Sequence, residues 1–191
     1  SFDSFSLDFY PEDMVNESTG LSARRMAELA LNRAKDFARN FDHSFENLFF
    51  YGDTGVGKTF LSYCIAKELL DTTHSVIYYS AFDLFDVFAR KTFSNSEESQ
   101  GENDYILDCD LLIIDDLGTE LTNSFVASQF FLCVNERILR KKSTIISTNL
   151  TLGSFMDTYS ERVFSRVSSN YTMIKLIGSD IRIQKKLLGG I

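Results

Sequence analysis

Apolar and polar residues follow two patterns along the chain, short continuous apolar runs and longer stretches with helical spacing. The apolar runs predict five strands, at 48–51, 76–81, 111–116, 144–149 and 172–177. Helical patterns fill the intervals between these strands. Because continuous apolar strands separated by helices are typical of a parallel sheet covered on both faces, the pattern predicts an α/β domain.

The region before the first predicted strand divides into two parts. Residues 22–40 have helical periodicity, and the positions expected to face the core are Met26, Leu29, Ala30, Ala34, Phe37 and Ala38. Residues 1–20 hold the only proline and should form an irregular segment that its Phe and Tyr side chains fix to the body. We therefore divide the chain into an amino-terminal segment, 1–21, and one domain, 22–191. The stretch 94–104, SNSEESQGEND, is expected to be a loop.

Length and composition allow an ordinary soluble domain. The chain has 191 residues, 44% of them hydrophobic, which is enough for one α/β core. The sequence has no run of about 18 apolar residues and no charged-then-apolar signal pattern, so we expect a cytoplasmic protein without a membrane partner. Cys64, Cys109 and Cys133 form no CxxC pair. They are expected to be small core residues, with a metal or redox role as the alternative.

Charge is distributed unevenly along the chain. The net charge is −8, but residues 1–136 carry −15 and residues 137–191 carry +7. The acidic total argues against a uniformly basic nucleic-acid-binding surface, whereas the basic carboxy-terminal part suits phosphates of a nucleotide or a nucleic-acid strand. Solvated helix faces are the alternative, particularly for Arg140, Lys141 and Lys142 at an expected helix end.

A glycine-rich loop follows the first predicted strand. Residues 52–59, GDTGVGKT, match G-x-x-x-x-G-K-[ST], in which successive backbone N–H groups and a helix N-terminus surround a phosphate. Lys58 would reach the outer phosphates and the Thr59 hydroxyl would bind Mg²⁺. The helical pattern continues at Leu61, Cys64, Ile65 and Leu69. We assign the nucleotide contacts of this loop to Gly52, Asp53, Thr54, Gly55, Val56, Gly57, Lys58, Thr59 and Phe60. A glycine turn with a surface lysine is the alternative.

Two carboxylates end the third predicted strand, in the segment LLIIDDLGTE. The carboxyl ends of strands are where α/β sheets bind ligands. Asp115 is expected to hold Mg²⁺, directly or through water, and Asp116 to act as general base on the attacking water. Enzymes of this type more often have Glu at the second position, so Glu120 is a rival base. An acidic turn without a function is the alternative.

The fourth strand ends in polar residues that could also face a phosphate. We expect strand 144–149 to lie between the strands that carry the two preceding motifs. Asn149, with Thr148 beside it, would then orient water and contact the terminal phosphate. The same residues are ordinary helix-capping residues, which is the alternative.

Three arginines follow toward the carboxy terminus. Arg162 and Arg166 are four residues apart and so share a helix face. Their guanidinium groups suit the nucleotide of a neighbouring subunit, or structural pairing with Glu161 or Asp157. Arg182 follows the last strand and could return to the nucleotide of its own subunit.

In this order, GDTGVGKT, LLIIDDLGTE, IISTN, ERVFSRV and SDIR resemble the AAA+ ATPases of the DnaC/DnaI helicase-loader family, with IstB transposition helpers as close relatives. The resemblance covers nearly the whole chain. It implies an α/β P-loop NTPase of the AAA+ (ASCE) class, three-layered αβα with a five-stranded parallel sheet and a lid domain absent or minimal. It also implies ATP and Mg²⁺ as ligands, Arg166 as arginine finger, Arg162 as the preceding box VII arginine, Asn149 as sensor 1 and Arg182 as sensor 2.

The resemblance further implies an extra helix after the second strand that faces nucleic acid, at SAFDLFDVFARKTF. Leu84, Phe85 and Phe88 should face the core and leave Phe82 and Val87 off that face. Such spare side chains could stack on bases or pack on a neighbouring subunit, with simple burial as the alternative.

The function implied is that of an ATP-dependent loader, which helps to place a replicative DnaB-type helicase on single-stranded DNA. The loader would self-associate into an ATP-dependent spiral and hydrolyse ATP slowly. The family's loaders also carry an amino-terminal helicase-binding domain, so we expect this chain to be a fragment. The alternatives are an IstB-like transposase helper and, because Asp116 replaces Glu, an ATP-gated interaction module with negligible turnover. A small-molecule kinase would have no use for Asn149 and the arginine pair.

Overall fold

The computed structural model describes residues 1–94, 97–120 and 123–188 and contains one parallel sheet. Its five strands lie in the order β2-β3-β4-β1-β5. Their bounds are β1 Leu48–Gly52, β2 Val76–Ser80, β3 Leu111–Leu117, β4 Ser143–Thr148 and β5 Thr172–Leu176. The five predicted strands are confirmed, and so is the position of β4 between β1 and β3, which brings the ends of all three motif strands to one edge.

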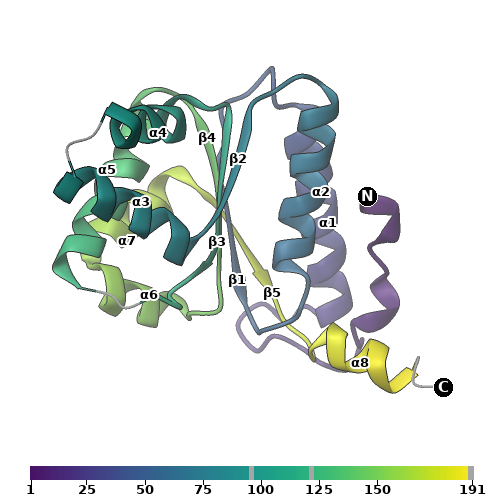
Figure 1. Ribbon diagram of the computed structural model, residues 1–191. Helices are drawn as coiled ribbons and strands as arrows, with labels where there is room; N and C mark the ends of the chain where they lie inside the picture. The colour runs from purple at the N-terminus through teal and green to yellow at the C-terminus, as the bar shows by residue number, and fades with distance from the viewer. Residues whose placement is uncertain (95–96, 121–122, 189–191) are drawn as a thin grey trace.

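Helices cover both faces of the sheet (Figure 1). One face carries α1 Ala23–Arg39 and α2 Lys58–Asp71, and the other carries α3 Ala81–Ser94, α4 Glu97–Asp108, α5 Ser124–Leu139, α6 Leu152–Tyr159 and α7 Glu161–Asn170. The last helix described is α8, Ile181–Leu188, which lies beyond the carboxyl end of β5. The predicted three-layer α/β fold is confirmed. The expected absence of a full lid domain stays a prediction, because it also depends on residues after 188, which lie outside the described residues.

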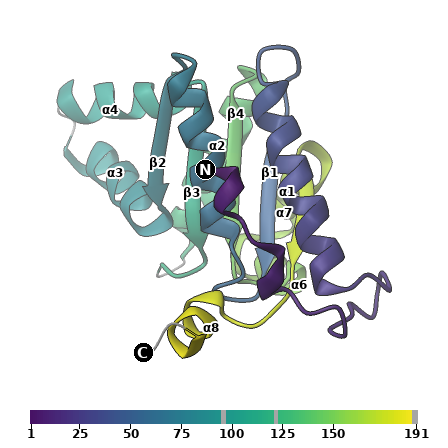
Figure 2. The ribbon, with the colours of Figure 1, turned by 90° about the vertical axis from the view of Figure 1, so that its right-hand side faces the viewer.

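The amino-terminal segment has two short 3₁₀ turns, η1 Phe2–Ser4 and η2 Leu7–Phe9. It lies along α1 and α2 and approaches α8 (Figure 2). Phe2 and Tyr10 are buried, as predicted for aromatic residues that fix an irregular segment to the domain.

Alternate residues of each strand enter two separate cores. Phe50 and Ile113 pack with α1 and α2, whereas Phe49 and Ile114 pack with the helices on the other face. Both faces of the central strands β1, β3 and β4 are therefore largely buried, which explains their continuous apolar sequence. Cys64, Cys109 and Cys133 are free and buried, as predicted for core residues.

Two residues predicted from helical periodicity are on the wrong side of their helices. Leu29 was expected in the core, but it lies beside the buried stripe of α1 and is 42% exposed. Val87 was expected off the core face, but it is 1% exposed because α3 packs against β2 and β3 and also against α4 and α5. A helix with neighbours on several sides buries more than one stripe. Phe82 is exposed, as predicted.

The loop predicted at 94–104 is wrong over its described part, because α4 begins at Glu97; residues 95–96 lie outside the described residues. Ile106 and Asn103 are buried, and the Tyr79 hydroxyl donates to Glu102 at 2.9 Å. These tertiary contacts stabilise a helix in a sequence whose local composition favours a loop. None of the described helices is both long and apolar enough to cross a membrane.

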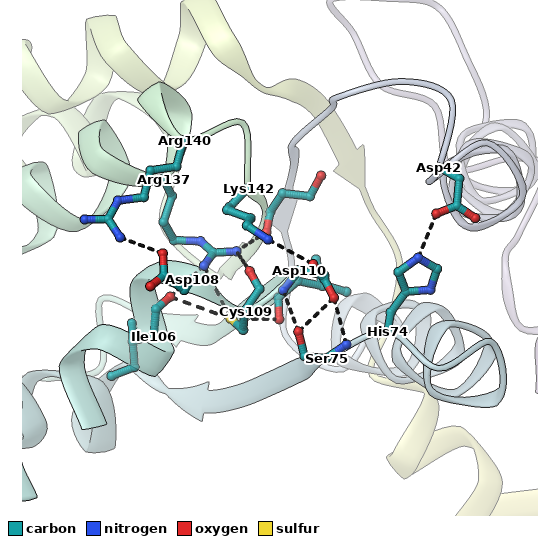
Figure 3. Close-up of polar contacts among 12 residues, drawn as sticks. Asp42, His74, Ser75, Ile106, Asp108, Cys109, Asp110, Arg137, Arg140 and Lys142 are labelled. Carbon is teal, nitrogen blue, oxygen red and sulfur yellow. Dashed lines mark hydrogen bonds and ion pairs between the residues drawn. The ribbon is translucent and has the colours of Figure 1, made fainter. Parts of the chain in front are cut away.

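A fully buried arginine joins elements at the amino ends of the strands (Figure 3). Arg137 of α5 donates to the carbonyl oxygens of Ile106, Cys109 and Ser143 and, through Nε, to the Thr144 hydroxyl. No carboxylate of the described chain pairs with it, so neutral acceptors solvate this cation, namely the three carbonyl groups, the Thr144 hydroxyl and the Cys109 sulfur. The arrangement fixes the end of α4 to the start of β4.

Two basic residues of the predicted cluster at the end of α5 are engaged in the same region. Arg140 pairs with Asp108 at 2.6 Å and Lys142 with Asp110 at 3.0 Å (Figure 3). They lie at the sheet edge opposite the glycine-rich loop. These contacts support the alternative of a solvated helix end for Arg140 and Lys142 rather than a phosphate-binding role.

Candidate nucleotide-binding site

The glycine-rich loop joins β1 to α2 and is enclosed by two other segments. Gly57 caps α2 with φ of 97°, and a Cβ there would lie 2.8 Å from the Tyr10 hydroxyl. Gly55 has φ of 73°, and a Cβ there would collide with the Asp180 carboxylate. Only glycine allows both the left-handed backbone and these close approaches. The loop therefore lies between the amino-terminal segment and the start of α8.

Lys58 is 5% exposed and crosses the loop. Its Nζ donates to the carbonyl oxygens of Gly52 at 2.8 Å and Asp53 at 2.5 Å, and to Oδ1 of Asn149 at 2.7 Å. Burial lowers the pKa of Lys58 to about 8, while nearby carboxylates, Asp116 first, oppose that shift. The ammonium group is thus held at the carboxyl ends of β1 and β4, with Asn149 beside it.

Asp115 is buried and surrounded by hydroxyl groups. The Thr59 hydroxyl lies 2.9 and 3.1 Å from its two carboxylate oxygens, and the hydroxyls of Tyr78 and Ser147 donate to Oδ2 and Oδ1. Adjacent ligands of an octahedral ion with bonds of about 2.1 Å are about 3 Å apart, so Thr59 and Asp115 fit neighbouring Mg²⁺ positions. In the described chain no three His, Cys, Asp or Glu residues form a metal site, so water and phosphate would complete the ligand set.

Asp116 lies within a register shift of β3, between Ile114 and Leu117, and has φ of 54°. Its N–H donates to the Ser147 hydroxyl at 3.1 Å, which fixes this unusual backbone. Burial, and then the charge of Asp115, raise the pKa of Asp116 against the opposing effect of Lys58 and Arg182. The rival base Glu120 accepts from the Gly118 N–H at 2.9 Å and from the Tyr159 hydroxyl. Its carboxylate is therefore already engaged.

A cavity of about 460 Å³ opens beside these groups. Ten predicted site residues line it: Thr54, Gly55, Gly57, Lys58, Thr59, Phe60, Asp115, Asp116, Asn149 and Arg182. The other lining residues were not predicted from the sequence; they are Ser4, Phe5, Ser6, Phe9, Tyr10, Tyr63, Ile181 and Lys185. Most of these come from the amino-terminal segment, whose density of aromatic residues was the available signal.

The amino-terminal segment forms an aromatic wall of the cavity. Phe5 stacks on Tyr10 with ring centroids 5.5 Å apart and lies 6.1 Å from Phe60. The Tyr10 hydroxyl donates to the Val56 carbonyl at 2.7 Å, which joins this wall to the glycine-rich loop. An apolar wall beside a phosphate-binding loop suits a flat nucleobase.

Six predicted site residues lie outside the cavity wall formed by the described residues. Gly52 and Asp53 contribute carbonyl groups to Lys58, and Val56 is buried. The remaining three are Glu120, Arg162 and Arg166.

The two predicted arginines, Arg162 and Arg166, belong to α7. This helix and α2, which follows the glycine-rich loop, lie on opposite faces of the sheet (Figure 1). The Arg162 guanidinium lies 4.0 Å from the centroid of the Phe131 ring, and Arg166 is half-buried. In the described chain neither forms an ion pair, so pairing with Glu161 or Asp157 is not observed.

Arg182 lines the cavity but pairs with its neighbour Asp180. Its Nε and Nη2 donate to the two carboxylate oxygens at 3.0 and 2.6 Å. This pairing lowers the pKa of Asp180 to about 2. The Ile181 N–H also donates to the Gly55 carbonyl at 3.0 Å, so the start of α8 is attached to the loop.

The chain is similar to proteins of known role. The chain is 29% identical over 140 residues to the replicative helicase loader DnaC of Escherichia coli (strain K12), covering 72% of this chain and 56% of the relative. It is 28% identical over 144 residues to the insertion sequence IS232 putative ATP-binding protein of Bacillus thuringiensis subsp. berliner, covering 73% and 56%. The chain thus spans about half the length of these curated relatives.

Solved structures show the same fold. A crystal structure of the DnaC helicase loader matches with a TM-score of 0.70 and 22% identity, covering 92% of this chain and 98% of that one. A crystal structure of DnaI matches with a TM-score of 0.64 and 21% identity, covering 80% and 85%. The resemblance to the DnaC/DnaI and IstB proteins is confirmed. A family model described as IstB-like ATP binding protein matches residues 12–187, and the chain belongs to this ATP-binding family.

Proposed function

We propose that this domain binds Mg·ATP in the 460 Å³ cavity and is the cytoplasmic ATPase module of a replicative helicase loader. The observation that carries the proposal is the convergence of Lys58, Asn149, Thr59 and Asp115 through direct hydrogen bonds at one end of that cavity. The DnaC relatives support the loader role, because they are named replicative helicase loaders.

The proposed site divides into a phosphate end and a base end. The loop N–H groups and Lys58 would hold the phosphates, and the aromatic wall around Phe5 would hold the adenine. Thr59 and Asp115 would hold Mg²⁺, which when bound neutralises charge developing on the outer phosphate oxygens.

Hydrolysis needs a base, and Asp116 is our proposal. Asp116 would accept a proton from water as the water oxygen attacks the γ-phosphorus and the bond to the β-phosphate oxygen breaks. Asn149 would orient that water. Asp116 lines the cavity and has a raised pKa, whereas the carboxylate of Glu120 is engaged by Gly118 and Tyr159.

The roles proposed for Arg162 and Arg166 require a second subunit, and the role proposed for Arg182 requires a movement of its side chain. Arg162 and Arg166 lie outside the cavity wall of their own chain, so we propose that they serve the ATP of an adjacent subunit in a spiral oligomer. Arg182 would exchange its contact with Asp180 for the phosphates. Nucleotide occupancy would thereby be coupled to assembly.

The proposed partners are a DnaB-type helicase and single-stranded DNA. Phe82 at the start of α3 is 67% exposed and offers an aromatic face for a base. One solved structure of the same fold is that of the replication initiator DnaA bound to AMPPCP and single-stranded DNA. The exposed ring and the relatives' names together support a DNA-contacting role for α3.

A second candidate is a helper ATPase for a transposase. The family model and the IS232 relative favour it, because both are named for insertion-sequence or IstB-like ATP-binding proteins. An ATP-gated interaction module with negligible turnover is the third candidate, since Asp116 is shorter than the Glu usual at that position.

One set of assays separates these candidates. ATP hydrolysis by this chain is measured alone, with single-stranded DNA, and with the replicative helicase or a neighbouring transposase from the same genome, and Lys58→Met is the control. Stimulation by DNA and ATP-dependent capture of the helicase support the loader. Capture of the transposase alone favours the helper, whereas ATP-dependent capture without hydrolysis favours the interaction module.

A further inference from the structure

We propose that Tyr78 is a positioning residue for the metal-binding carboxylate of Asp115, an inference that rests on the Mg·ATP site proposed above. The Tyr78 hydroxyl donates to Oδ2 of Asp115 from β2, while the Ser147 hydroxyl donates to Oδ1 from β4. Thr59 reaches both oxygens from α2. Three elements therefore meet at one carboxylate.

The hydrogen bonds leave a defined set of acceptor sites for the metal. An ionised carboxylate has about four lone-pair sites. Tyr78 and Ser147 each use one site on a different oxygen, and Thr59 approaches both oxygens, at 2.9 and 3.1 Å. Because Thr59 is the other proposed Mg²⁺ ligand, the two strand hydroxyls fix the carboxylate in the orientation that the metal needs. Hydrogen-bond partners of this kind usually tune metal affinity.

The Tyr78 ring is itself fixed in place. It stacks on Tyr63 of α2 with ring centroids 4.8 Å apart and planes 12° apart. Tyr63 lies one helical turn after Thr59, so α2 carries both a proposed metal ligand and the residue that holds the Tyr78 ring.

The next residue of β2 provides a matched control. Tyr79 points to the opposite face of the sheet, where its hydroxyl donates to Glu102 of α4 at 2.9 Å. Tyr79→Phe therefore removes the same hydroxyl-to-carboxylate hydrogen bond from the same strand, but away from the proposed metal. A purely structural role for Tyr78 predicts similar effects of the two substitutions.

The test is a Mg²⁺ titration of the binding of a fluorescent non-hydrolysable ATP analogue, with thermal unfolding to verify that each variant is folded. Tyr78→Phe should raise the Mg²⁺ concentration for half-maximal binding by about 10- to 100-fold. At saturating Mg²⁺ its affinity for the analogue should return to that of the wild type. Tyr79→Phe should shift the midpoint by less than about 2-fold, because the Tyr79 hydroxyl binds Glu102 on the opposite face of the sheet, away from the proposed metal.

Equal Mg²⁺ midpoints for Tyr78→Phe and the wild type would overturn this inference alone. If the wild type binds the analogue without needing Mg²⁺, the proposed metal site fails and the role of Tyr78 fails with it. Should Tyr78→Phe not fold, Tyr63→Leu replaces it, because Tyr63 is 54% exposed. Loss of the stacking should raise the midpoint by about 2- to 10-fold, and an unchanged midpoint would again reject the inference.

Discussion

The Nζ of Lys58 lies 2.7 Å from Oδ1 of Asn149, and this hydrogen bond joins the start of α2 to the end of β4. The other two acceptors of Lys58 are carbonyl groups of its own loop. A triphosphate would compete with all three for the ammonium group, and Asn149 would then be free to contact a phosphate or water. The residue pair thus offers a direct link between nucleotide occupancy and β4.

The first prediction concerns Lys58→Met, which keeps the length of the side chain and removes its charge. We expect nucleotide binding to fall by at least about 100-fold, because charged hydrogen bonds to phosphate are each worth roughly 1.5–3 kcal/mol. Titration with a fluorescent ATP analogue measures this loss. Lys67→Met is the control, because Lys67 lies on the exposed side of the same helix and pairs with Asp71. Equal affinities of the two variants would contradict the assigned site.

The second prediction concerns stability and pH. Lys58 has a pKa of about 8 in the folded protein, below its ordinary 10.5, because burial disfavours the charge. Below pH 8 the folded and unfolded states both bind the proton, and the cost of burying the charge is fully present. Between pH 8 and 10.5 the unfolded state binds more protons, so the free energy of unfolding rises with pH.

Relative to Lys58→Met, the wild type should therefore gain up to about 3 kcal/mol over this pH range. Urea denaturation of both proteins at pH 7, 8, 9 and 10 measures the difference. A difference that is independent of pH would show that Lys58 keeps its ordinary pKa in the folded protein.

The third prediction separates the two rival bases. Asp116→Asn should bind Mg·ATP and assemble, but should hydrolyse ATP about 100- to 10,000-fold more slowly, which is the usual contribution of a general base. Glu120→Gln should lower stability through its contacts with Gly118 and Tyr159 and leave turnover per folded protein nearly unchanged. Single-turnover hydrolysis and thermal unfolding of both variants distinguish these outcomes. The reverse pattern would make Glu120 the base.

The sequence predicted the framework because its signals are local. A continuous apolar run marks a buried strand wherever it lies, and the glycine-rich loop and paired carboxylates fix which strand ends must meet. The position of the fourth strand then follows, because Asn149 at its end must lie between the glycine-rich loop and the paired carboxylates. Each of these steps depends on a few adjacent residues.

The features that the sequence did not predict depend on contacts between distant segments. Helix α4 forms because Ile106 and Asn103 are buried against other elements, although its sequence is polar. Val87 is buried by helices that surround α3, which periodicity within α3 cannot reveal. The aromatic wall around Phe5 forms because the amino-terminal segment folds back on the glycine-rich loop. The hydrogen bond that joins them, from Tyr10 to Val56, links residues 46 positions apart in the sequence.

The fourth prediction concerns Arg137, whose buried guanidinium joins α4 to β4. Arg137→Met removes the donor from three carbonyl groups, and each unsatisfied buried acceptor costs about 1–3 kcal/mol, although removal of a buried charge offsets part of this loss. We expect the free energy of unfolding to fall by about 2–4 kcal/mol. Nucleotide affinity of the folded protein should not change, because Arg137 lies at the opposite edge of the sheet.

Arg140→Met is the control for this prediction, since Arg140 lies one turn along α5 and its ion pair with Asp108 is partly exposed. Exposed ion pairs contribute about 0–1 kcal/mol. Urea denaturation of the two variants should therefore give clearly different midpoints. Similar midpoints would mean that water replaces the guanidinium group without loss.

The fifth prediction concerns Arg166, which is half-buried on α7 and lies outside the cavity wall of its own chain. Arginine fingers supplied by a second subunit are worth about 10³ to 10⁵ in rate. Arg166→Ala should bind the ATP analogue like the wild type but lose hydrolysis and ATP-dependent assembly. Analogue binding and sedimentation velocity with and without ATP measure the two properties. Arg39→Ala, on the exposed end of α1, should behave like the wild type in both.

A mixing experiment decides whether Arg166 acts on another subunit. Subunits with Arg166→Ala keep an intact glycine-rich loop, and subunits with Lys58→Met keep an intact α7, so one type of hybrid interface contains both functional halves. We expect a mixture of the two inactive proteins to regain part of the ATPase rate, with a maximum at an intermediate ratio. If hybrid oligomers form and remain inactive, or if Arg166→Ala alone hydrolyses ATP normally, Arg166 has no role across an interface. The half-buried Arg166 would then contribute only to the packing of α7.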